Sequence, residues 1–164
     1  MSNPDAFGYT IFCDDIRFEL GGKLSFMGVY QAVMYVHEDF PTSIPKLVLS
    51  IHYSEKLGSE PKPTSIQIFM PGDRDEQPGM TADLPVDDIR KMPVPALGTE
   101  LGLPPPEFLS LGMQVAFAPL QLKNPGVIRV TANRGGEKIR LGSLRVLRAP
   151  PNLAEKPNEP SGGA

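Results

Sequence analysis

The stretch LSLGMQVAFA, residues 109–118, alternates large apolar residues with small or polar ones. Its odd positions hold Leu109, Leu111, Met113, Val115 and Phe117. Successive side chains of a β-strand point to opposite faces, so this period of two predicts a strand with one buried face. A helix would scatter the same apolar residues around its whole circumference.

The same alternation recurs along the chain. Lys46–Ser54 repeats it, with large apolar residues on the odd positions. Proline and glycine (19 and 16 of 164 residues) are too frequent for a helical bundle. Further strands are predicted at Tyr9–Asp14, Ile16–Leu20, Leu24–Tyr30, Ala32–Val36, Ser65–Met70, Val127–Asn133 and Glu137–Leu147.

These strands predict an all-β fold, an antiparallel β-sandwich of roughly seven to nine strands. We expect it to span residues 6–149, after an N-terminal arm at residues 1–5. Residues 150–164 contain four prolines and end in Ser-Gly-Gly-Ala, which predicts a disordered tail.

The region between residues 71 and 107 is rich in charges, prolines and turns. A short strand fits Thr81–Leu84, one helical turn fits Asp87–Lys91, and Pro104–Pro106 predicts a polyproline II connector.

Two hairpins can be registered by placing apolar residues opposite apolar ones. Around Gly21 and Gly22, a three-residue loop pairs Leu20 with Leu24 and Phe18 with Phe26, which we expect to face each other on the core side.

Around Gly135 and Gly136, a two-residue loop suits a type I′ turn. It pairs Arg134 with Glu137, Asn133 with Lys138, Ala132 with Ile139, Thr131 with Arg140, and Val130 with Leu141. The apolar parity then shifts, which predicts a β-bulge at Gly142–Ser143.

The second hairpin gathers positive charge on one sheet face. Its register puts Lys138 and Arg140 opposite the core, together with Arg129 and Arg145. These four residues are the candidate binding site, and a solvated face is the alternative. As an interface, the face is a patch for an acidic protein, nucleic acid or a phosphate group. An acidic protein partner is expected, with the acidic N-terminal portion of a second copy (a homodimer) as one candidate.

The charge of the chain is unevenly distributed. Residues 1–120 carry a net −8 and residues 121–164 a net +5, while the whole chain carries −3. This balance predicts no nucleic-acid partner. Cys13 is the single cysteine, residues 1–5 lack the features of a signal peptide, and no apolar run is long enough for a membrane span. We therefore expect a soluble, cytoplasmic protein.

No catalytic motif, metal site or cofactor site is predicted. His37 and His52 lack the spacing of zinc ligands, and Cys13 lies on an apolar strand parity, as expected for an inert buried thiol. Acidic loop residues could bind calcium if Asp14, Asp73, Asp75 and Asp87 gathered at one end of the sandwich.

The N-terminal segment from Tyr9 to Tyr30 carries a recognisable pattern. Cys-Asp-x-x-Arg-x-Glu runs into Gly-Lys-x-Ser and Gly-x-Tyr at Cys13, Asp14, Arg17, Glu19, Gly22, Lys23, Ser25, Gly28 and Tyr30. The pattern, and the closing LGSLRV at residues 141–146, resemble a family of small bacterial proteins of unknown function. The resemblance implies an all-β domain and no particular activity or cofactor.

Together these features predict a non-enzymatic binding or interaction module. Two alternatives stay open. One is an enzyme with an unrecognised carboxylate or metal site, and the other is a calcium- or lipid-responsive sandwich domain, by analogy of fold.

Overall fold

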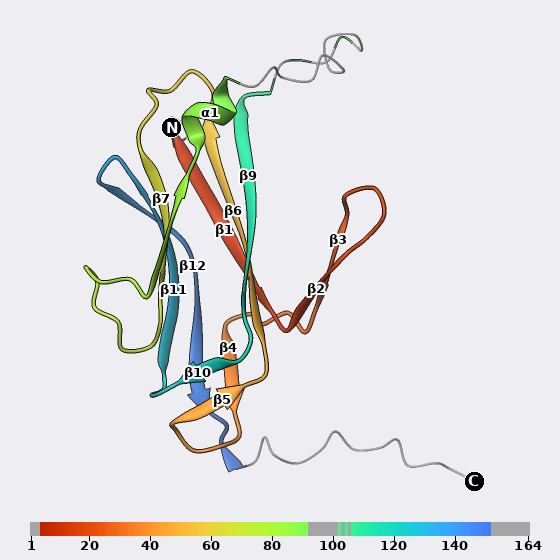
Figure 1. Cartoon of the computed structure of the whole chain (residues 1–164), viewed down its shortest axis with the longest axis vertical. Helices are drawn as coiled ribbons and strands as arrows, with labels where there is room; N and C mark the ends of the chain where they lie inside the picture. Colours follow the sequence, from red (N-terminus) through yellow and green to blue (C-terminus); the bar gives the residue numbers. More distant parts are fainter. Residues whose placement is uncertain (1–3, 92–101, 103, 105, 152–164) are drawn as a thin grey trace.

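A computed structural model describes residues 4–91, 102, 104 and 106–151 (Figure 1). Its regular secondary structure is nearly all β-strand, with one five-residue helix, α1 (Val86–Arg90). No described helix is long and apolar enough to cross a membrane. The strands are β1 (Ala6–Cys13), β2 (Asp15–Phe18), β3 (Leu24–Met27), β4 (Val33–Val36), β5 (Thr42–Ile44), β6 (Leu47–Lys56), β7 (Thr64–Phe69), β8 (Met80–Leu84), β9 (Phe108–Phe117), β10 (Leu120–Leu122), β11 (Gly126–Arg134) and β12 (Glu137–Arg148).

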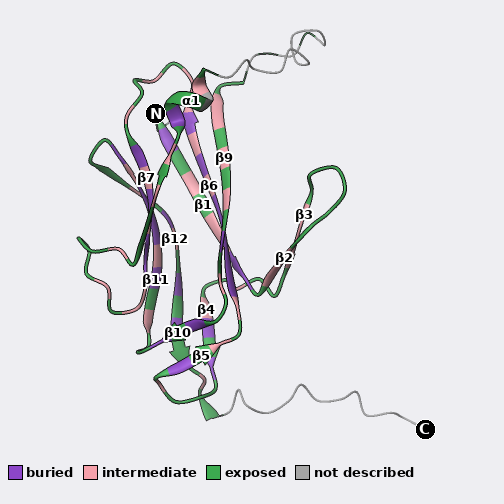
Figure 2. Cartoon of the chain, in the orientation of Figure 1, coloured by how far each residue is buried: buried purple, intermediate pink, exposed green. Residues whose placement is uncertain are grey.

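Two main sheets enclose the core, which confirms the predicted sandwich. One sheet has the strand order β1-β6-β9 and the other β4-β12-β11-β7-β8. Burial alternates along most strands, as Figure 2 shows, and the inner side chains of both sheets form a single apolar cluster. Leu47, Leu49 and Ile51 of the central strand β6 are at most 1% exposed within it.

All nine predicted strands are present, and β8 covers the further short strand predicted at Thr81–Leu84. The structure adds two short strands, β5 and β10. Strands β5 and β10 pair only with each other, and three residues are too few to produce a readable alternation. One pair departs from the antiparallel prediction, because β4 runs parallel to β12.

The register predicted for the first hairpin is wrong. Phe18 lies opposite Leu24, and Phe26 lies opposite Ile16, so the loop is shifted by one residue toward the N-terminus. Each residue of β2 therefore pairs with a residue two positions earlier in β3 than predicted. A change of two positions keeps the side chains on the same face, so apolar residues still lie opposite one another. Phe18 is 75% exposed, since β2 and β3 form a separate two-stranded sheet away from the core.

The second hairpin follows the predicted register for its first four pairs. Gly135 and Gly136 adopt φ values of 56° and 93°, as a turn with two left-handed residues requires. The bulge comes earlier than predicted, because Val130 pairs with Gly142 and Leu141 is the extra residue. The core explains this position, since the bulge lets Leu141 and Leu144 both lie buried.

Two glycines allow β1 to approach its neighbours closely. A Cβ atom at Gly8 would lie 2.2 Å from the carbonyl oxygen of His52 and 2.8 Å from the side chain of Leu141. A Cβ atom at Gly142 would lie 3.0 Å from Thr10. Strand β1, at the edge of the first sheet, therefore also packs against β12 of the second sheet. This contact closes the sandwich at the edge formed by β1.

The polyproline connector falls largely outside the described residues, as do residues 152–164 of the predicted tail. These two expectations stay predictions. The helical turn expected at Asp87–Lys91 corresponds to α1, one residue earlier in the chain.

Gly8→Ala should destabilise the protein by roughly 1–3 kcal/mol, because the added methyl group would overlap backbone atoms of β6. Chemical denaturation monitored by circular dichroism measures the change. Gly112→Ala is the matched control: its Cβ would meet the same His52 at 3.8 Å, an ordinary contact. Equal stability of the two variants would contradict the close approach at Gly8.

Candidate functional site

The four predicted cations all lie on the outer face of the five-stranded sheet. Arg129 comes from β11, and Lys138, Arg140 and Arg145 come from β12. Ile128 and Leu144, which are neighbours of opposite parity, are completely buried, and Ile139 is half-buried. Lys138, Arg140 and Arg145 are exposed. The placement opposite the core is therefore as predicted.

Three of the four cations surround one hollow, which has a volume of about 360 Å³. We call it the cationic hollow. It lies beside the bulge at Leu141, where small residues of β12 leave room on the sheet surface. Its lining residues are Asp75, Val127, Arg129, Val130, Thr131, Lys138, Arg140, Gly142 and Ser143.

Phe69 holds two of the cations in place. Its ring is fully buried although it belongs to the outer parity of β7, opposite Arg129. The Cζ of Arg129 lies 4.8 Å from the ring centroid, and the Nζ of Lys138 lies 5.0 Å from it. Cations over an aromatic face are attracted by its negative potential, so the ring positions both charges.

A carboxylate from the β7–β8 loop already contacts these cations. Arg129 donates a hydrogen bond to Oδ1 of Asp75, and Lys138 donates one to the backbone carbonyl of Asp75 at 3.5 Å. The hydrogen bond from Arg129 and its positive charge hold the pKa of Asp75 below its usual value. The face therefore stabilises a carboxylate in its ionised form.

Two groups of the hollow are left without polar partners among the described residues. The buried hydroxyl of Thr131 has no hydrogen bond there, and Arg140, which lies opposite Thr131 in the sheet, has no acidic partner. Buried hydroxyls in proteins are nearly always hydrogen-bonded. An anionic group in the hollow would supply an acceptor close to both residues.

Arg145 lies on the same face but outside the hollow. It is placed between Val127 and Val33 of the neighbouring strands. Tyr35 and Leu147, which are 45% and 38% exposed, belong to the same end of the sheet. The structure thus brings together Arg129, Lys138 and Arg140 and separates Arg145 from them.

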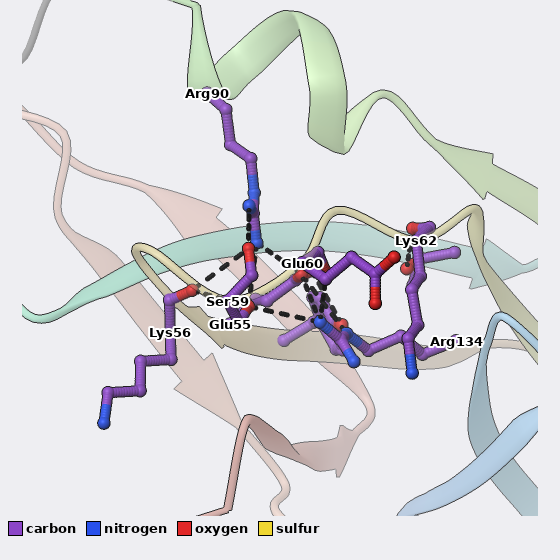
Figure 3. A network of polar contacts seen from close by, with 9 residues as sticks. Glu55, Lys56, Ser59, Glu60, Lys62, Arg90 and Arg134 are labelled. Atoms are coloured by element: carbon purple, nitrogen blue, oxygen red, sulfur yellow. Dashed lines mark hydrogen bonds and ion pairs between the residues drawn. The ribbon is translucent and has the colours of Figure 1, made fainter.

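A second polar cluster lies inside the protein, at the end of the sandwich near α1 (Figure 3). Glu55 and Arg134 are each 1% exposed, and Nη2 of Arg134 lies 3.0 Å from Oε1 of Glu55. Arg90 of α1 binds the same oxygen at 2.5 Å, and Tyr53 donates a hydrogen bond to the other. Burial would lower the pKa of Arg134, but its hydrogen bond to Glu55 and that residue's negative charge raise it.

This cluster fastens a loop to both sheets. Arg134 also donates to the hydroxyl of Ser59 and to the carbonyl of Glu60, both in the β6–β7 connection. Sequence reasoning missed the ion pair, although a signal exists: Glu55 and Arg134 continue the buried parity of β6 and β11. Its contacts with Arg90, Tyr53 and the β6–β7 connection make the ion pair a structural element of the fold.

Two residues with nucleophilic groups, Cys13 and Ser50, are inaccessible. Cys13 is completely buried, and burial raises the pKa of its thiol, as do the neighbouring Asp14 and Asp15. Ser50 lies 3.1 Å from Nε2 of His52, but it is also completely buried, so no substrate reaches its hydroxyl. Within residues that the structure describes, no three His, Cys, Asp or Glu side chains gather to hold a metal ion.

Three residues of the N-terminal pattern, Asp14, Gly28 and Tyr30, lie together at the base of the β2–β3 hairpin. Tyr30 donates a hydrogen bond of 2.5 Å to Oδ1 of Asp14. Gly28 has a φ of 64°, and a Cβ atom there would lie 2.0 Å from Oδ2 of Asp14. A glycine, an aspartate and a tyrosine at these positions therefore have a structural role.

Arg134→Ala should destabilise the protein by roughly 3–5 kcal/mol, because it removes one of the two cations that neutralise the buried Glu55 carboxylate and empties the space of a buried side chain. Urea denaturation checks this value. The matched control is Arg145→Ala, an exposed arginine of β12, which should change stability by less than about 0.5 kcal/mol. Similar losses in both variants would contradict the structural role of the buried pair.

Arg129→Ala should raise the pKa of Asp75 toward the ordinary aspartate value, because the variant lacks the hydrogen bond and charge that stabilise the carboxylate. An NMR titration of the Asp75 carboxyl carbon measures it. Lys138→Ala should raise it less, since Lys138 contributes least among the groups that act on Asp75. An unchanged titration in the Arg129 variant would contradict the contact.

Comparison with known proteins yields no match to a family model, a curated protein or a solved structure. The resemblance of the N-terminal pattern therefore stays a prediction.

Proposed function

We propose that the protein is a non-enzymatic interaction module that binds an acidic segment of a partner protein in the cationic hollow. The partner's carboxylates would contact Arg129, Lys138 and Arg140. We further propose that the protein acts in the cytoplasm, because its single cysteine, Cys13, is a buried thiol with no disulfide.

The position of the Asp75 carboxylate beside Arg129 is the observation that carries this proposal. This residue is on an exposed loop, and its side chain in the Arg129 contact is 72% exposed. An exposed ion pair is weak and open to competition from another carboxylate. Asp75 thus occupies the place that a partner's aspartate or glutamate would take, beside an Arg140 side chain that has no acidic partner among the described residues.

The alternatives have less support. An enzyme needs a reactive group within reach of substrate, and Cys13 and Ser50 are both buried. Calcium binding needs several oxygen ligands in one place. Asp14 instead pairs with Tyr30 at the base of a hairpin, while Asp75 pairs with Arg129 on the outer sheet face.

Binding of a fluorescein-labelled hexaglutamate peptide, followed by fluorescence anisotropy, tests the proposal. Affinity should fall as salt rises from about 50 to about 300 mM, because salt screens exposed charges. Arg140→Ala should weaken binding roughly two- to fivefold, as expected for the loss of one exposed ion pair. Asp75→Ala should strengthen it by a similar factor, since it releases Arg129.

Two matched controls use the exposed pair of Arg148 and Asp39 elsewhere on the protein. Arg148→Ala and Asp39→Ala change the net charge in the same way as the two test variants, and binding should stay unchanged. No effect of Arg140→Ala, or tighter binding of an oligonucleotide of equal charge than of the peptide, would contradict the proposal.

A further inference from the structure

The β2–β3 hairpin forms an arm that stands away from the sandwich (Figure 1). Its two strands make a sheet of their own. Phe18 is 75% exposed and Leu20, in the loop, is 95% exposed. A two-stranded sheet with exposed apolar residues is marginally stable in water, and a third strand or a packing partner is needed to stabilise it.

The base of the arm is fixed. Lys46 forms an ion pair with Asp15, the first residue of β2, at 2.5 Å. Tyr30, which follows β3, donates a hydrogen bond to Asp14, which precedes β2. The chain hydrogen-bonds back to β1, since the amide of Tyr30 donates to the carbonyl of Phe12. The exposed residues are therefore presented outward in a defined orientation.

The outer edge of β2 has hydrogen-bonding groups to offer. The amide of Glu19 donates to the carbonyl of Lys23, so the backbone groups of Glu19 point toward β3. The N–H and C=O groups of successive residues in a strand point to opposite edges, so those of Phe18 point toward the outer edge of β2. In the part of the chain that the structure describes, no strand pairs with that edge. Such an edge is a template for another strand.

We propose that two copies of this chain associate through the β2 edges of their arms, antiparallel and about a two-fold axis at Phe18. The two Phe18 residues would exchange both backbone hydrogen bonds, and the arms would form one four-stranded sheet. A two-fold contact requires a surface complementary to itself. Strand β2 meets this requirement in one register.

That register places Arg17 opposite Glu19 of the second copy, twice by symmetry. Like-signed pairs exclude the two adjacent registers: one sets Arg17 against Arg17, and the other sets Glu19 against Glu19. A register centred on Ile16 would use Asp15, which already pairs with Lys46. Charge complementarity therefore selects a second copy with Phe18 at the axis.

Sedimentation equilibrium over protein concentrations up to about 0.5 mM tests the proposal. This range is needed because a contact between two short strands buries little surface, as weak protein–protein interfaces do. The native chain should show a monomer–dimer equilibrium. Arg17→Glu or Glu19→Arg should each weaken dimerisation at least about tenfold, because each replaces two attractions by two repulsions. The double variant, Arg17→Glu with Glu19→Arg, should restore the native constant, because the pairs are re-formed with their signs exchanged.

Lys91→Glu is the matched control. It makes the same change in net charge as Arg17→Glu, at a side chain 77% exposed near α1, and should leave dimerisation unchanged. All variants should keep the native melting temperature and the native affinity for the hexaglutamate peptide, which separates this inference from the proposed function. A native chain that stays monomeric, or a double variant as weak as the single ones, would overturn the proposal.

Discussion

Two opposite charges, Glu55 and Arg134, lie almost without solvent between the two sheets of the sandwich. An unpaired buried charge is so unfavourable that β6 and β11 must come together in one arrangement that satisfies both. Together with the completely buried Ile128, Val130 and Ala132, the pair also fixes which way β11 faces. With Arg134 inside, alternation turns Asn133, Thr131 and Arg129 outside. The outer cations and the buried ion pair are thus two results of the same strand register.

Much of the fold could be predicted from the sequence, because a half-buried strand imposes a period of two on its residues. The long strands β6 and β9 carry that period in full. The turn at Gly135 and Gly136 could also be predicted, since two left-handed residues need glycine there. The first hairpin could not be registered correctly, because pairing apolar residues opposite one another assumes that they point to the core. Phe18 is exposed and does not point to the core.

The candidate site was partly predictable. Alternation alone puts Arg129, Lys138 and Arg140 on one face, since each is near the turn that fixes the register. The rest depends on contacts between distant segments. Asp75 reaches the face from the β7–β8 loop, and the buried ring of Phe69 comes from β7. The bulge that makes room for the hollow follows from the packing of Leu141, which single-strand parity does not describe.

The parallel pairing of β4 with β12 has a consequence for the synthesis of the chain. Val33 lies opposite Arg145, more than a hundred residues later, so β4 can join its sheet only after the chain has been made through β12. Strand β1 likewise packs against β12. Contacts between such distant residues slow folding, because the long intervening loop must close first. On the ribosome the N-terminal strands therefore keep open edges, and the sandwich closes only after β12 has emerged.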